Sequence, residues 1–152
     1  MTLTHDTIRL NRAFDAPVSR VFAAWAQTEA LEDWCTPGDD NWSSHVRAHD
    51  FRVGGEKTIT FGPTGETPYV EQSHYLDIAA DRHIINSERI LRGEELISVS
   101  KIILEFAGAG TGCRLSVTDQ ITLLTDGDSP EQRRTGWGEV LDRLQVYLAD
   151  GR

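Results

Sequence analysis

Basic residues and long apolar runs are scarce in this 152-residue sequence, and both shortages exclude classes of protein. Lysine and arginine number 15 against 24 aspartates and glutamates, which gives a formal net charge of −9 at pH 7. Because an acidic surface repels phosphate groups, we expect neither nucleic acid nor an anionic membrane surface as a partner. A bilayer span needs about 18 consecutive apolar residues, and no such run occurs. The segment from Met1 to Arg12 contains no apolar stretch, so we expect no signal peptide and a cytoplasmic protein.

Cysteine is also scarce, which bears on metals and disulfides. Cys35 and Cys113 lie far apart and form no CxxC pair, and the histidines have no metal-binding spacing. We therefore expect no metal and no cofactor. Two free thiols fit a reducing cytoplasm, with a single long-range disulfide as the alternative. The sequence has no GxSxG motif and no glycine-rich phosphate loop before a helix, so we assign no catalytic residue.

What the sequence does contain is the composition of a globular domain. Hydrophobic residues make up 39% of the chain and charged residues 26%, which is typical of a folded protein. No proline- or serine-rich tract, internal repeat or low-complexity run marks a linker. We therefore expect a single domain over residues 1–152.

The N-terminal part changes from a period of two to a helical period. Apolar residues at alternate positions predict a strand over residues 7–14. Pro17 suits the first turn of a helix, and the apolar residues that follow have helical spacing: Val18, Val21, Phe22 and Trp25. Thr28 can cap a second short helix that carries Trp34, and residues 37–41 should follow as a loop.

The rest of the chain predicts a meander of strands and one long helix. Residues 44–124 alternate on a period of two between turn signals, which indicates six further strands. Ser129 and Gln132 form a capping box with Pro130 at the first helical position, and an apolar stripe then runs from Trp137 to Leu148. This order predicts an α+β fold. A strongly bent antiparallel sheet of about seven strands would wrap around the long C-terminal helix, with two short helices after the first strand.

Five short motifs make this fold prediction more specific. In chain order they are Pro17-Val18-x-x-Val21-Phe22-Ala23-Ala24-Trp25, Leu31-x-x-Trp34, Asp50-x-Arg52-x-Gly54-Gly55, Gly110-Thr111-x-x-x-Leu115-x-Val117-Thr118 and Trp137-x-x-Val140-Leu141-x-x-Leu144. Together, over about residues 7–149, they resemble the family named for the C-terminal domain of the activator of Hsp90 ATPase. That family belongs to the START-like (SRPBCC) superfamily. The resemblance implies the helix-grip fold and a cavity between the sheet and the last helix, whose lining varies among members.

The sequence departs from the family pattern at two positions. Relatives usually carry an aromatic residue directly after the equivalent of Trp34, where this chain has Cys35. They also tend to carry an aromatic residue where Asn86 stands. Both changes would enlarge the cavity or make it more polar if these side chains face inward.

Strand parity predicts which polar residues face the cavity. Val70, Leu76 and Ile78 suggest an even inner face for their strand, and this turns Gln72 and His74 inward. The same reasoning places Glu88 inside from the strand near residues 84–90, Ser100 from residues 96–106 and Asp119 from residues 114–123. A bulge near residues 96–106 would reverse the assignment there.

These polar residues, together with the apolar walls, form the predicted ligand site: Trp34, Gln72, His74, Glu88, Ser100, Asp119, Trp137 and Leu141. Asp119 needs a partner because a buried carboxylate is costly, and His74 is one candidate. Such a pair could hold a polar substituent of an apolar ligand or act as a general base. The alternatives are a solvated Asp119 at the cavity mouth and a purely structural His74.

Three functions stay open at this point. The first is binding of a small, largely hydrophobic molecule in the cavity. The second, implied by the family resemblance, is an interaction module that stimulates the chaperone Hsp90. The third is a cyclase- or hydrolase-type enzyme that uses His74 with Asp119. Both a monomer and a homodimer are compatible with the sequence.

Overall fold

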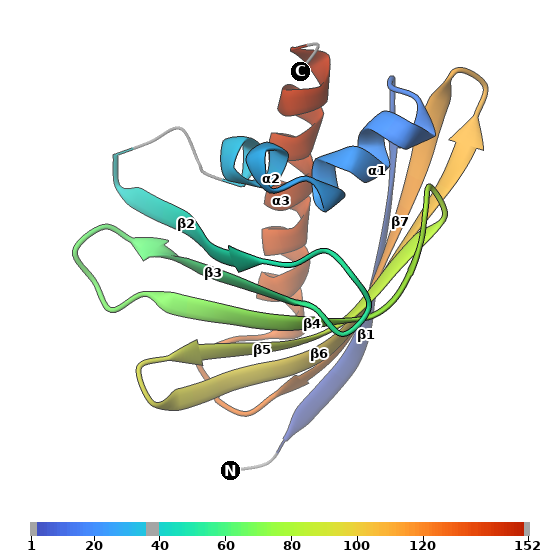
Figure 1. Ribbon diagram of the computed structural model, residues 1–152. Helices are drawn as coiled ribbons and strands as arrows, with labels where there is room; N and C mark the ends of the chain where they lie inside the picture. Colours follow the sequence, from blue (N-terminus) through green and yellow to red (C-terminus); the bar gives the residue numbers. More distant parts are fainter. Residues whose placement is uncertain (1–2, 36–39, 151–152) are drawn as a thin grey trace.

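Over residues 3–35 and 40–150, which the computed structural model describes, the chain forms seven strands and three helices (Figure 1). In chain order they are β1 (Thr4–Phe14), α1 (Val18–Ala26), α2 (Thr28–Trp34), β2 (Trp42–His49), β3 (Glu56–Pro63), β4 (Tyr69–Ala79), β5 (His83–Arg92), β6 (Glu95–Ala109), β7 (Gly112–Leu123) and α3 (Pro130–Ala149). The predicted order of elements is confirmed. Part of the predicted loop over residues 37–41, including Pro37-Gly38, lies outside the described residues.

The strands form one antiparallel sheet in the order β1-β7-β6-β5-β4-β3-β2. The sheet curls around α3, which crosses its concave face, and α2 lies beside α3 (Figure 1). Buried side chains of the sheet and α3, such as Leu115, Leu141 and Leu144, have no exposed surface and meet in the core. This arrangement buries one face of the sheet and the apolar stripe of α3 together, and it confirms the predicted α+β helix-grip fold.

Local sequence signals set the ends of these elements. The Ser129 hydroxyl accepts a hydrogen bond from the backbone N–H of Gln132 (3.1 Å), and Pro130 begins α3. Gly93 adopts φ +61 in the turn between β5 and β6, a conformation that favours glycine. Thr28 is not the predicted cap: it is the first residue of α2, and its hydroxyl lies 2.9 Å from His49 Nδ1.

A β-bulge at Leu76 makes one predicted strand orientation wrong. The pairing of β4 with β5 shifts between Tyr75 and Asp77, so Leu76 is an extra residue and is 49% exposed. Before the bulge the odd positions face the core, as buried Tyr75 shows; after it the even positions do, as with Ile78. The inner-face assignment drawn from Leu76 and Ile78 therefore fails for the first part of β4.

A second bulge lies at the start of β6. The pairing of β5 with β6 shifts between Ile90 and Leu91, and Ile97 rather than the predicted Leu96 is buried. Beyond this point the predicted even parity of β6 holds, with Ser98, Ser100 and Ile102 buried. No helix among the described residues is long and apolar enough to cross a membrane.

Candidate ligand cavity

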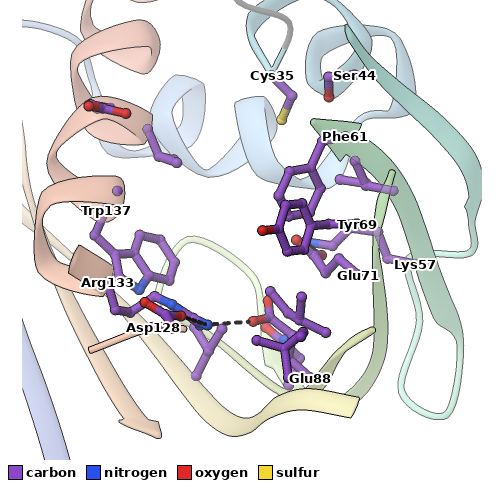
Figure 2. A pocket seen from close by; sticks show the side chains of 18 of the residues that line it. Cys35, Ser44, Lys57, Phe61, Tyr69, Glu71, Glu88, Asp128, Arg133 and Trp137 are labelled. Atoms are coloured by element: carbon purple, nitrogen blue, oxygen red, sulfur yellow. Dashed lines mark hydrogen bonds and ion pairs between the residues drawn. The ribbon is translucent and has the colours of Figure 1, made fainter. Parts of the chain in front are cut away.

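A cavity of about 810 Å³ lies between the inner face of the sheet, α2 and α3. Its apolar wall comes from the helices and from the inner faces of β2 to β6: Trp25, Leu31, Trp34, Trp42, Ile59, Phe61, Tyr69, Ile84, Ile90, Ile97, Ile102, Leu104, Trp137 and Val140. Figure 2 shows Phe61 and Tyr69 projecting from the sheet toward the same space as Trp137 of α3. The cavity is large enough for a drug-sized molecule.

One side of this wall is a row of stacked rings. The rings of Trp42 and Phe61 have centroids 6.3 Å apart, and those of Phe61 and Tyr69 lie 5.5 Å apart at 18°. The Arg92 guanidinium sits 5.0 Å from the centroid of the Tyr69 ring. Since β2, β3 and β4 are neighbours, one aromatic residue from each produces a continuous flat surface.

The structure turns two predicted site residues away from the cavity. His74 is exposed, and its Nε2 atom lies 3.8 Å from the carboxylate of Glu56. Gln72 accepts a hydrogen bond of 3.4 Å from Arg89 on the outer face. Their predicted inward orientation is wrong because the Leu76 bulge reverses the parity of β4. The predicted pair of His74 with Asp119 does not form.

The other predicted residues lie inside. Glu88, Ser100 and Asp119 are buried on the inner faces of β5, β6 and β7. Trp34 and Trp137 line the cavity, whereas Leu141 has no exposed surface and belongs to the core. Binding of a ligand by these residues stays a prediction.

Asp119 finds its partners on α3. Its Oδ2 atom accepts a 2.9 Å hydrogen bond from Trp137 Nε1 and lies 3.7 Å from Arg133 Nη1. Its Oδ1 atom has no hydrogen bond from the described residues. Asp119 has no exposed surface, so the alternative of a solvated carboxylate at the mouth is wrong.

Arg133 contacts four other side chains at this polar end of the cavity. It donates to Ser98 Oγ (3.0 Å) and to Asp128 Oδ2 (3.2 Å) through Nη2. Its Nη1 atom lies 3.7 Å from Glu88 (Figure 2) and 3.7 Å from Asp119. Sequence reasoning missed Arg133, although it stands four residues before Trp137 and therefore on the same helix face.

Glu88 is held in an environment that favours its protonated form. Burial raises the pKa of Glu88 to about 8, and the neighbouring charges of Glu71 and Asp119 act in the same direction. The positive charges of Arg133 and Lys57 only partly oppose this. At neutral pH the side chain is therefore mostly an uncharged hydrogen-bond donor and acceptor.

A buried ion pair between β3 and β4 is a second polar feature that the sequence reasoning missed. Lys57 Nζ lies 3.2 Å from Glu71 Oε2, and both side chains are largely buried. Burial is the largest single influence on the pKa of Lys57 and lowers it. The charge of Glu71, with smaller contributions from Tyr75, Glu88 and Cys35, together outweighs burial, so the pKa is raised. The signal for Lys57 was its shared parity with Ile59, an inward residue of the same strand.

The residues that depart from the family pattern both line the cavity. Cys35 and Asn86 both have small side chains and form part of the lining, as expected if they faced inward. Burial raises the pKa of the Cys35 thiol to about 12, which keeps it protonated and unreactive. Cys113 is also a free thiol, as expected for two unpaired cysteines.

Comparison with known proteins agrees with this architecture. The Mll3558 protein of Rhizobium loti is 28% identical, with 97% of this chain and 99% of that chain covered and a TM-score of 0.86. A protein from Rhizobium leguminosarum is also 28% identical, with 98% and 97% covered and a TM-score of 0.88. DynU16, a protein of the dynemicin biosynthetic locus, has 17% identity and a TM-score of 0.72, covers 97% of this chain and 48% of its own, and shows the fold alone.

Sequence profiles identify the family directly. No curated protein matches the chain. The profile described as activator of Hsp90 ATPase homolog 1-like protein matches residues 15–149, which include all three helices and six of the seven strands. The chain therefore belongs to the activator of Hsp90 ATPase homolog 1-like family, within the START-like superfamily.

Proposed function

We propose that the protein binds a small, largely hydrophobic molecule in the cavity between the sheet and α3. The observation that carries this proposal is the lining of the 810 Å³ space, where apolar and aromatic walls meet a few buried polar groups at one end. This combination is typical of ligand pockets, in which apolar contact supplies affinity and polar groups fix orientation.

The apolar contribution comes from both sides of the cavity. On the sheet side, Phe61 and Tyr69 offer ring faces, and on the α3 side Trp137 and Val140 complete the wall. Burial of apolar ligand surface contributes roughly 25 cal/mol per Å². The cluster of Arg133 and Glu88 would then orient the one polar substituent of such a ligand.

Native mass spectrometry tests the proposal. The purified protein is measured alone and after incubation with fatty acids, aromatic compounds and isoprenoids, and we expect retention of at least one small molecule in a one-to-one complex. Uptake should fall when Ile102, which lines the cavity, is replaced by Trp and should persist when exposed Leu76 is replaced by Trp. A protein that takes up no member of the panel would contradict the proposal and make stimulation of Hsp90 ATPase the next activity to measure.

A further inference from the structure

Around Arg133, the polar end of the cavity holds more acidic than basic side chains. Three carboxylates, from Glu88, Asp119 and Asp128, surround the single guanidinium of Arg133 at 3.7, 3.7 and 3.2 Å. They come from β5, β7 and the segment before α3, while Arg133 comes from α3 itself. Asp128 receives a direct hydrogen bond from Arg133, so one guanidinium is shared among three acids.

Among these acids, Glu88 is the one available to a ligand. It is 8% exposed, it lines the cavity, and no described residue donates a hydrogen bond to it. Asp119 is bonded to Trp137, and Asp128 to Arg133 and to the backbone N–H of Ser129. Figure 2 shows the Glu88 side chain joined to Arg133 by the 3.7 Å ion pair and lying on the same side of the cavity as Tyr69. A buried carboxyl group without a hydrogen-bond donor favours a ligand that supplies one.

Two other cations of the lining are already engaged with carboxylates. Lys57 is paired with Glu71 at 3.2 Å, and Arg92 with Glu66 at 3.2 Å. Arg143 also lines the cavity, and its buried Nε atom has no hydrogen-bond partner among the described residues. It stands ten residues beyond Arg133, about 15 Å along α3, and is not among the charges that act on Glu88. An anionic ligand head beside Glu88 would therefore add a further negative charge to a group of acids that one guanidinium already serves.

Ring faces add a second attraction for a cation. Phe61 and Tyr69 project into the same space as Glu88, and Trp137 closes it from α3 (Figure 2). Aromatic faces attract ammonium groups through the ring quadrupole, and more strongly when water is excluded. A carboxylate beside such rings is suited to an organic ammonium ion.

We infer that the cavity takes a lipophilic amine, whose ammonium head pairs with Glu88 while its apolar body lies against the aromatic wall. This inference rests on the proposed function, since it specifies the ligand class of the same cavity. The ammonium N–H groups would donate to the Glu88 carboxylate, and the ligand's charge would reduce the local excess of acid.

Binding of an ammonium ion at Glu88 should be coupled to the loss of the Glu88 proton, so the affinity should depend on pH. The groups that face Glu88 are Glu71 and Lys57 from the β3–β4 side, Asp119 from β7, and Arg133 from α3. In the empty protein the pKa of Glu88 is about 8, so at lower pH an ammonium ligand must displace a proton. The affinity for an amine should rise with pH up to about pH 8, by at most about tenfold for each pH unit. The affinity for an uncharged ligand should not rise over that range.

The test uses three ligands that differ only in their head group: decylamine, decan-1-ol and sodium decanoate. Isothermal titration calorimetry at about pH 6.5, 7.5 and 8.5 measures their affinities for the full-length protein. At pH 8.5 we expect decylamine to bind at least about tenfold more tightly than decan-1-ol, and decanoate to bind most weakly. The decylamine affinity should rise with pH and the decanol affinity should not.

Matched variants connect the effect to one residue. Glu88→Gln should lower the decylamine affinity about tenfold at pH 8.5, remove its pH dependence and leave the decanol affinity within about twofold. Glu105→Gln makes the same charge change on the exposed side of β6 and should alter neither. Where Glu88→Gln does not fold, the wild-type order of affinities at pH 8.5, at which decylamine is almost wholly charged, decides.

Two results would overturn the inference by different routes. Tightest binding of decanoate or decanol, or a decylamine affinity that does not rise with pH, would exclude the amine while leaving hydrophobic binding intact. Binding of none of the three ligands would contradict the proposed function itself, and the inference with it.

Discussion

Trp137 Nε1 donates a 2.9 Å hydrogen bond to Asp119 Oδ2, and this bond joins the middle of α3 to the central part of β7. Asp119 has no exposed surface, so the indole N–H is the partner that keeps this carboxylate from being buried without a donor. The same bond fixes one face of the Trp137 ring toward the cavity. Asp119 in the core and Trp137 in the cavity wall therefore hold each other in place.

Replacing Trp137 by Phe should measure this bond. Phe keeps a ring but removes the donor, so we expect a loss of about 1–3 kcal/mol in the free energy of unfolding. Urea denaturation of Trp137→Phe, Asp119→Leu and the double variant gives the coupling between the two residues. The loss caused by Trp137→Phe should shrink when Asp119 is already Leu, and equal losses in both backgrounds would contradict the bond's contribution.

Loss of the buried cation Lys57 should be much more costly than loss of an exposed one. Lys57→Met leaves Glu71 buried without its partner at 3.2 Å, and we expect a destabilisation of about 3 kcal/mol. Arg52→Met removes the exposed ion pair with Asp50 and should cost at most about 1 kcal/mol. Both values come from chemical denaturation at neutral pH, and similar losses for the two variants would contradict the buried role of Lys57.

Glu88 should make the protein's stability depend on pH. Its pKa in the folded protein, about 8, lies above the ordinary glutamate value of 4.5. Between these values the folded state binds more protons than the unfolded state, so the free energy of unfolding falls as pH rises. The slope from this group is at most about 1.4 kcal/mol per pH unit.

Glu88→Gln should remove this dependence because Gln does not titrate. Denaturation curves between about pH 5 and 8.5 should show the wild type losing stability relative to Glu88→Gln as pH rises. The titration of the Glu88 carboxyl carbon by NMR gives the pKa directly. Parallel stability profiles, or a titration midpoint near that of an ordinary glutamate, would contradict the prediction.

Filling the cavity at Cys35 should weaken ligand binding. Cys35→Phe replaces a small side chain of the lining by a ring, which would occupy space that is now open. We expect at least a tenfold loss in affinity for decylamine and decan-1-ol alike, with folding retained. Leu76→Phe enlarges an exposed side chain outside the cavity and serves as the control. Unchanged affinity in Cys35→Phe would show that the ligand lies elsewhere.

His74→Ala should have almost no effect. The side chain is exposed and lies 3.8 Å from Glu56, outside the cavity. We expect a change within about 0.5 kcal/mol in the free energy of unfolding and an unchanged ligand affinity. A marked loss of binding in His74→Ala would contradict the strand orientation that the Leu76 bulge imposes.

Local sequence patterns determined the order of elements and the inner faces of the central strands. Period-two alternation places Glu88 and Asp119 inside because the extra residues of the nearby bulges lie on β4 and β6, and β5 and β7 themselves keep an unbroken alternation. The start of α3 follows from Ser129 and Pro130, whose effect on the backbone is local. The family motifs also fixed the fold, since together they span most of the chain.

Only the tertiary structure decided the orientation of β4 and the partners inside the cavity. The bulge at Leu76 is a feature of the pairing of β4 with β5, and no local sequence pattern reveals it. His74 was therefore assigned to the wrong face of the sheet. Arg133 contacts Asp119, which lies 14 residues before it in the chain, and Glu88, which lies 45 residues before it. Such contacts depend on how α3 lies across the curled sheet, and this packing is a property of the whole fold.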